Sequence, residues 1–150
     1  MLRMSKKTLL ALEAVVDIAY HARPEPVQSK EITKRQGIPQ RYLEQVMQQL
    51  VHAGVLKGVR GPRGGYRLAR ERRRITVGEI VRIVSAMEVS EEKSAGNSSS
   101  IGDKVVRPLL SRVQENMMRD LDEVTIEDLC RGVDEKGAGE TLAPTADFNI

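Results

Sequence analysis

The chain has 150 residues, 40% of them apolar, which is enough to bury the core of one domain of ordinary size. With three Tyr, one Phe and no Trp, that core has to be built from aliphatic side chains and Met, which favours helices. A single cysteine excludes an internal disulfide and any all-cysteine metal site within one chain. No apolar run is long enough to span a bilayer and no signal peptide is recognisable, so the sequence predicts a cytoplasmic protein with no membrane partner.

Charge is unevenly distributed along the chain. The net charge is +3, but residues 30–74 carry twelve Lys and Arg against three Asp and Glu, whereas residues 75–150 carry eight against fifteen. A basic block beside an acidic half is typical of a nucleic-acid-binding module joined to another part. For any single Lys or Arg, a solvated surface position is the alternative interpretation.

A helix-turn-helix pattern opens the basic block. Apolar residues recur at helical spacing over 5–21, which predicts a first helix. Ser29 is expected to cap a second helix over 30–36, and Gly37 to end it. A third helix is predicted from about 40 to 53, and the pattern of helix, short turn with Gly, helix is that of a helix-turn-helix. The inner face of the third helix would be formed by Leu43, Val46 or Met47, and Leu50.

A basic hairpin is predicted directly after the third helix. Alternating segments at 55–59 and 66–69 flank a Gly- and Pro-rich turn. The hairpin is too basic to be only a core element, and we interpret it as the wing of a winged helix. Its basic residues are Lys57, Arg60, Arg63, Arg67 and Arg70.

These elements suggest how the chain would bind DNA. The first residues of a recognition helix contact base edges in the major groove, where Gln pairs with adenine and Arg with guanine. Arg60, beside a slim Gly/Pro turn, is expected to enter the minor groove, although the glycines could also serve the turn alone. Tyr42 is equally compatible with a half-buried packing position. The predicted DNA-binding residues are Ser29, Lys30, Gln40, Arg41, Tyr42, Gln45, Arg60, Gly61, Pro62 and Arg63.

For several neighbouring charged residues, the predicted roles are less specific. Lys30, Lys34 and Arg35 are expected to contact phosphates, which position a protein without reading sequence. Glu44 could accept a hydrogen bond from cytosine or orient Arg41. A solvated run that adds salt-dependent affinity is predicted for Arg72, Arg73 and Arg74.

The second half of the chain predicts more helices. Thr76 and Glu79 match a capping box that starts a fourth helix, and Thr125 and Asp128 match a second box that starts a short helix through residue 130. We divide the chain into a winged helix-turn-helix domain over 1–87, a flexible linker over 88–104, dimerisation helices over 105–131 and a disordered tail over 132–150. The predicted fold class is therefore mainly α with a small β-hairpin.

A long apolar seam predicts a homodimer. The seam is too narrow and too long to be covered by a small winged domain, so a partner helix is expected, with packing back on the same chain as the alternative. Its residues are Val106, Leu110, Val113, Met117 and Leu121.

The segments IPQRYLEQVM at 38–47 and RGPRGGY at 60–66 resemble the Rrf2 family of bacterial winged-helix regulators. This family includes regulators of iron–sulfur cluster, nitric-oxide and cysteine-metabolism genes. The resemblance is dense over residues 4–87 and loose over 105–131. It implies a homodimeric, sequence-specific transcription regulator, usually a repressor, whose long helices cross in the dimer.

One departure from the family concerns the cofactor. Many members hold an iron–sulfur cluster on three cysteines, but the matching segment here, residues 88–104, contains none. We therefore expect no metal and no cofactor, and the chain looks most like the branch that represses cysteine-metabolism genes. Cys130 is expected to be a small buried residue, with redox sensing as the alternative. No catalytic constellation or nucleotide loop is recognisable, so an enzyme is not predicted.

The last residues predict a protein partner. Phe148, Asn149 and Ile150 resemble the tails of serine acetyltransferases that dock into cysteine synthase (O-acetylserine sulfhydrylase), where a carboxylate is captured by backbone donors. The alternative is a frayed, functionless terminus. Two competing functions stay open: a regulator that responds to a small ligand or to oxidation of Cys130, and an interaction protein that acts mainly through this tail.

Overall fold

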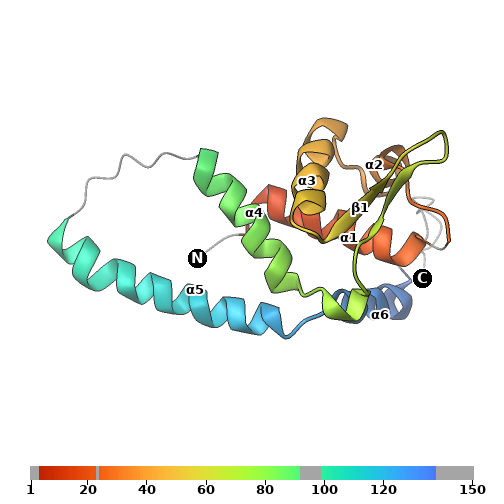
Figure 1. The fold of residues 1–150 in the computed structure, drawn as a ribbon. Coiled ribbons are helices and arrows are strands. Elements are labelled where there is room, and N and C mark those ends of the chain that lie inside the picture. Colours follow the sequence, from red (N-terminus) through yellow and green to blue (C-terminus); the bar gives the residue numbers. More distant parts are fainter. Residues whose placement is uncertain (1–3, 23, 92–98, 138–150) are drawn as a thin grey trace, which may run out of the picture.

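The computed structural model describes residues 4–22, 24–91 and 99–137. The fold consists of helices with one small antiparallel sheet at its edge, so the predicted mainly helical fold with a hairpin is confirmed (Figure 1). No helix in these three ranges combines the length and the apolar character needed to cross a bilayer. The order is α1 (Lys6–His21), α2 (Ser29–Gln36), α3 (Gln40–His52), β1 (Leu56–Val59), β2 (Gly65–Leu68), η1 (Arg72–Arg74), α4 (Val77–Glu91), η2 (Gly102–Val106), α5 (Arg107–Asp122) and α6 (Ile126–Lys136).

The start of α2 differs from the prediction by one residue. Ser29 is the first helical residue rather than the cap, and the carbonyl of Gln28 accepts the first backbone N–H groups of the helix. The cause is an interaction two residues before Ser29: the backbone of Val27 pairs with that of Tyr66 through hydrogen bonds of 2.9 and 2.7 Å. This pairing keeps the chain extended as far as residue 28. At the other end, Gly37 has a φ of 66°, as its predicted role as a helix stop requires.

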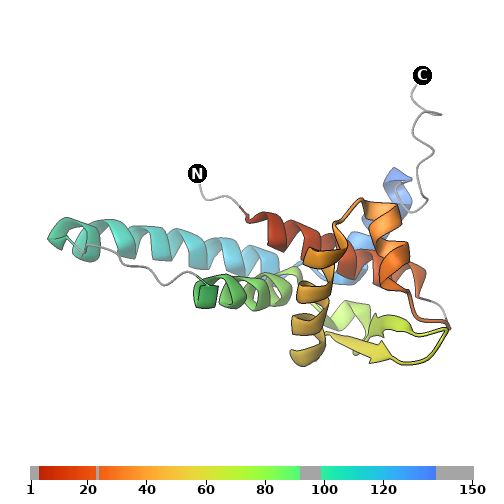
Figure 2. The same cartoon turned by 90° about the horizontal axis from the view of Figure 1, so that it is seen from above.

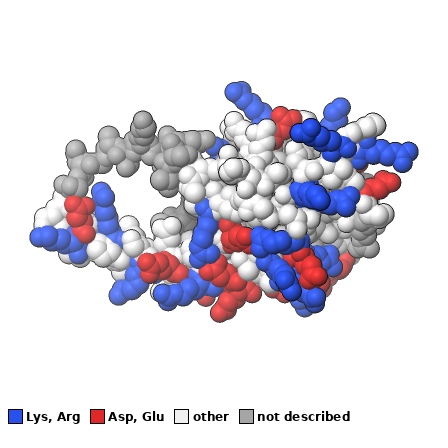
Figure 3. Space-filling view, in the orientation of Figure 1, with Lys and Arg blue, Asp and Glu red and all other residues white. Residues whose placement is uncertain are grey.

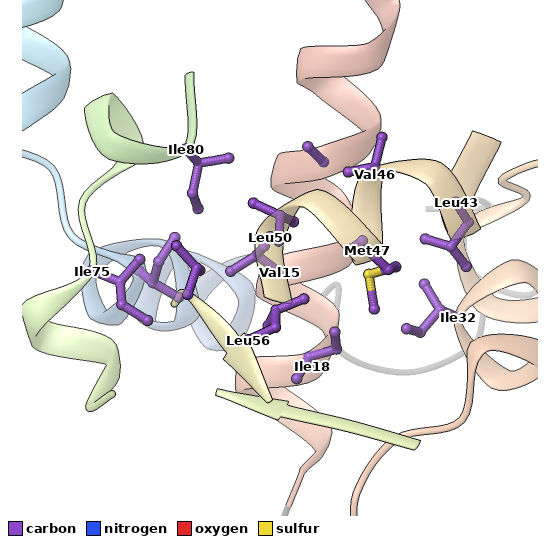
Figure 4. Packing of buried hydrophobic residues seen from close by; sticks show 14 of the residues in the cluster. Val15, Ile18, Ile32, Leu43, Val46, Met47, Leu50, Leu56, Ile75 and Ile80 are labelled. Carbon is purple, nitrogen blue, oxygen red and sulfur yellow. The ribbon is translucent and has the colours of Figure 1, made fainter. Parts of the chain in front are cut away.

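The core lies between α1 and α3 and extends to α4 and α6 (Figure 4). The predicted inner face of α3 is confirmed, because its four apolar residues are each at most 1% exposed: Leu43, Val46, Met47 and Leu50. They meet Val15 and Ile18 of α1, which are fully buried. Burial of one such side chain contributes about 1.5–3 kcal/mol, so this face fixes which side of α3 is left for solvent.

Glycines allow the wing to form. The two strands pair with Leu56 opposite Leu68 and Val59 opposite Gly65. A Cβ on Gly64 would lie 2.2 Å from the carbonyl oxygen of Val59, and a Cβ on Gly65 would lie 2.3 Å from that of Val27. Gly65 therefore lets β2 approach the connection between α1 and α2, so the predicted hairpin packs against the backbone at Val27.

The predicted linker over 88–104 is wrong at both ends. Helix α4 continues to Glu91, and helical structure resumes at residue 100, so the correction leaves only residues 92–98, which lie outside the described part of the chain. The charged and polar residues at these two ends are compatible with helix, because Glu and Lys have good helix propensity. The π-helical turn η2 has a local cause: Pro108 has no N–H to donate, and the N–H of Arg107 reaches the carbonyl of Gly102, five residues back.

Helix α5 projects from the winged domain as a long arm. Both views show it running beside α4 and then beyond it (Figures 1 and 2). At its C-terminal end, a guanidinium–carboxylate pair joins Arg82 of α4 to Asp122. Gly78 permits this approach, because a Cβ there would lie 2.0 Å from the Asp122 carboxylate.

Helix α6 returns the chain to the domain. The N–H of Ile126 donates to the carbonyl of Ile75 at 2.9 Å, and α6 then packs against α1. The predicted capping box of Thr125 and Asp128 is confirmed in both directions. The helix is longer than expected: it continues to Lys136, so the prediction of a disordered tail from residue 132 is wrong for 132–136. Contact with α1 stabilises this added turn. A prediction from local composition alone does not take such a contact into account.

Candidate nucleic-acid interface

The outer face of α3 is open at its N-terminal end. Gln40, Arg41, Tyr42 and Gln45 are all exposed, as expected for a recognition helix. Tyr42 is 45% exposed, which leaves part of its side chain open for contact and does not decide between DNA contact and the half-buried packing position.

Hydrogen bonds position the first residue of this face. The Gln40 Nε2 donates to Glu44 Oε1 at 3.1 Å and to Ser29 Oγ at 3.4 Å. Glu44 therefore positions Gln40. One of the two roles predicted for Glu44 was to orient Arg41 instead. The contact with Ser29 also joins the N-terminal ends of α2 and α3, which fixes the spacing between the phosphate-contacting and base-contacting residues that the sequence predicted.

The wing tip lies beside the start of α2. Arg60, Gly61, Pro62 and Arg63 are exposed, and Gly61 has a φ of 108° that a non-glycine residue rarely adopts. The structure brings three predicted residues to one surface hollow, whose lining includes Ser29, Lys30 and Arg60. Figure 3 shows Lys and Arg side chains around the part of the molecule where α2, α3 and the wing lie, while acidic residues are more frequent along α5 and α6.

Arg35 is not available for DNA, contrary to the prediction. Its Nε and Nη2 donate to the two carboxylate oxygens of Asp17 at 2.9 and 2.8 Å, and Gln36 Nε2 donates to the same carboxylate at 2.7 Å. Asp17 is 3% exposed, and this hydrogen-bonded carboxylate raises the pKa of Arg35. The pair joins α1 to α2, so Arg35 has a structural role, whereas Lys30 and Lys34 are exposed.

The other arginines of the basic block divide in the same way. Arg70 donates to the carbonyl of Gly54 and pairs with Glu79, and Arg72 pairs with Glu127. The predicted solvated run is therefore wrong for Arg72. It holds for Arg73 and Arg74, whose side chains are 72% and 75% exposed beside Glu71. The wing's outward charge comes from Lys57, Arg60 and Arg63.

The predicted dimer seam is apolar and largely uncovered. Val106, Leu110 and Val113 are 44–46% exposed, while Met117 and Leu121, nearer the domain, are half-buried. The sequence reasoning missed a second exposed row that runs from the start of η2 into α5, formed by Ile101, Val105 and Leu109 at 72%, 63% and 48% exposure. Its spacing of four residues was the signal that could have found it.

Cys130 lies in the core, as expected, at 2% exposure. Burial raises the pKa of its thiol, and the thiolate is the reactive form, so this environment disfavours redox sensing. The donor set also does not fit an iron–sulfur cluster: residues 88–104 contain no cysteine, and the described residues hold no group of three or more His, Cys, Asp or Glu side chains placed to bind a metal ion. The predicted tail residues Phe148, Asn149 and Ile150 lie outside the described residues.

Comparisons with known proteins agree with this geometry. The family model of Rrf2, described as an iron-dependent transcriptional regulator, matches residues 4–132. The HTH-type transcriptional regulator IscR of Xenorhabdus nematophila is 32% identical over 131 residues, which is 87% of this chain and 80% of that protein. The solved structure of IscR from T. potens has a TM-score of 0.72 at 36% identity and covers 90% of each chain. CymR, the global cysteine regulator of B. subtilis, has a TM-score of 0.70 at 30% identity, covering 88% of this chain and 98% of its own.

The family model spans most of the chain, and these relatives are transcription regulators rather than enzymes. Their winged-helix fold is the fold found here. The chain belongs to the Rrf2 family of winged-helix, DNA-binding transcriptional regulators.

Proposed function

We propose that this chain is a homodimeric, sequence-specific repressor that places α3 in the major groove and the wing in the adjacent minor groove. The observation that carries the proposal is the hollow that Arg60 of the wing shares with Ser29 and Lys30 of α2. Phosphate, base and minor-groove contacts from one surface are the combination that a winged helix needs.

The dimer is proposed from α5. Six large apolar side chains between residues 101 and 113 are exposed, and an uncovered apolar surface of this kind marks an interaction site. A symmetric pair of these arms would hold two winged domains for two half-sites on DNA.

The regulated genes are proposed to be those of cysteine and sulfur metabolism. Two features support this assignment: the similarity to the B. subtilis cysteine regulator, and a donor set that does not fit the cysteine-held cluster of other family members. Cysteine synthase is the proposed sensor through Phe148, Asn149 and Ile150. Titration of cysteine synthase, followed by the fluorescence of its pyridoxal phosphate, tests this contact, with the chain lacking Ile150 as control. An equal response from both chains would contradict the tail contact.

DNA fragments selected from the source genome by the purified protein would test the function. We expect a shared inverted repeat upstream of sulfur genes and a fluorescence-anisotropy Kd in the nanomolar range. Arg60→Ala should weaken specific binding by about 1–3 kcal/mol, as for the loss of one groove contact. The control is Arg131→Ala, which removes the same charge from an exposed side chain of α6, outside the basic block. Equal effects of the two variants would remove the wing from this proposal.

A further inference from the structure

A second hollow lies at the base of the wing, where β2 leads into η1. Ile18 and Ala19 of α1 and Ala22 just after it line the hollow together with Leu68 of β2, and its volume is about 570 Å³. Small-molecule sites have volumes of about 300–1,000 Å³ and combine apolar walls with a few polar groups. Arg67 supplies such a group here, whereas its neighbour Tyr66 lines the hollow that faces α2.

Arg67 has an unused hydrogen-bond donor. Its Nη2 donates to the carbonyl of Pro24 at 3.1 Å, but its Nε is buried and has no acceptor, the one such side-chain nitrogen or oxygen in the described residues. A buried N–H without a partner costs about 1–3 kcal/mol, so an acceptor that reaches it would be bound favourably. A carboxylate is suited to this task, because two oxygens can accept from one guanidinium.

Salt bridges already compensate most of the charges that line the hollow. Arg70 pairs with Glu79, Arg72 pairs with Glu127, and Glu71 is bonded to Arg73 at 3.0 Å. Glu25 also lines it. The cationic group that the hollow offers to a carboxylate is therefore the guanidinium of Arg67.

We propose that this hollow binds a small organic carboxylate with a short branched apolar chain. The carboxylate accepts from Arg67 Nε, and the apolar chain lies against Ala19, Ala22 and Leu68, which are partly exposed. Binding would also affect the wing, since the hydrogen bonds from Arg67 to Pro24 and from Tyr66 to Val27 join β2 to the connection that precedes α2. This coupling rests on the proposed DNA-binding function, whereas occupation of the hollow does not.

The probe is 4-methylpentanoate, titrated into the full ¹⁵N-labelled chain while the Arg67 Nε–H resonance and the Leu68 amide are followed by NMR. We expect saturable shifts that 4-methylpentanamide, which lacks the charge, and inorganic phosphate, which lacks the apolar chain, do not produce. Arg67→Lys keeps the charge but removes the Nε–H, and should weaken binding at least about tenfold by the Leu68 signal. Arg112→Lys, on the exposed surface of α5, should leave it unchanged.

Three results would overturn the site: no saturable shift, equal shifts with the amide or with phosphate, or unchanged binding by Arg67→Lys. The effect on DNA is read separately, as an anisotropy Kd with and without saturating probe. A change of at least about threefold supports coupling to the wing. An unchanged Kd refutes the coupling to the wing, whereas the NMR titration still decides whether the hollow binds the probe. Absence of specific DNA binding in either condition would refute the proposed function alone.

Discussion

Asp17 is a buried carboxylate that holds α2 against α1. Both of its oxygens accept from Arg35, and its side chain is fully buried. Removal of one partner of a buried pair leaves the other charge uncompensated, and this is the costly case. Helix α3, the proposed recognition helix, follows α2 directly, so the orientation of the proposed DNA-binding surface depends on this contact.

We predict that Asp17→Asn lowers the free energy of unfolding by about 3–5 kcal/mol, measured by urea denaturation. Glu31→Gln is the matched control, because Glu31 lies 3.9 Å from the same guanidinium and is 49% exposed. Its loss should stay below about 0.5 kcal/mol. Similar stabilities of the two variants would show that the buried pair contributes no more than a surface pair.

Gly65 determines whether the wing can join the rest of the domain. A side chain there would meet the backbone of Val27, with Cβ 2.3 Å from its oxygen and 2.6 Å from its carbonyl carbon. Backbone atoms cannot move aside as a flexible side chain can. The element therefore depends on one residue without a side chain.

Gly65→Ala should cost about 2–3 kcal/mol of stability and abolish hydrogen-exchange protection of the Tyr66 amide, which now donates to Val27 at 2.7 Å. Gly58→Ala is the control on the opposite strand: Gly58 pairs with Tyr66 in the register, and a Cβ there meets nothing within 4 Å. Its stability should change by less than about 0.5 kcal/mol. A protected Tyr66 amide in Gly65→Ala would contradict the close approach.

The capping box of α6 predicts a pH dependence. The backbone N–H of Thr125, and then its hydroxyl, lower the pKa of Asp128. A carboxyl with a lowered folded pKa stabilises the protein above its unfolded value, near 3.9, and this contribution is lost as the pH falls through the folded pKa. Asp128→Asn should flatten the fall of the urea midpoint between about pH 5 and pH 2. Asp120→Asn, on the exposed part of α5, is the control, and an equally steep fall in Asp128→Asn would contradict the assignment.

The elements that the sequence predicted well are those with local causes. The inner face of α3 follows from its periodicity, and the capping box of α6 needs only residues three positions apart. Arg35 could not be told from Lys34, because its partner Asp17 comes from α1, 18 residues away. The same holds for α6, whose last turn depends on contact with α1. Composition alone suggested a linker over 88–104, but polar composition does not separate an exposed helix from an irregular segment.

At the scale of the whole molecule, the arm formed by α5 carries apolar side chains that the rest of the described chain leaves exposed. Its exposed apolar residues occupy two adjacent rows, with Ile101, Val105 and Leu109 beside the predicted seam. Two rows make a face wider than the narrow seam of a two-helix coiled coil, which uses only the a and d positions. We therefore expect each arm to contact more than one element of the partner.

Leu110→Asp should convert the proposed dimer to a monomer. Leu110 is 45% exposed in one chain and lies within the predicted seam. Association would bury the new carboxylate in an apolar surface, so the dimer dissociation constant should rise at least about 100-fold by analytical ultracentrifugation. Val51→Asp is the control: it adds a carboxylate at a position 36% exposed on α3, and should leave the dimer intact. Loss of the dimer should also weaken binding to a two-half-site operator far more than to one half-site, because the second winged domain no longer arrives already tethered. A dimer that survives Leu110→Asp would place the symmetric contact on another surface and leave the exposed face of α5 to a different partner.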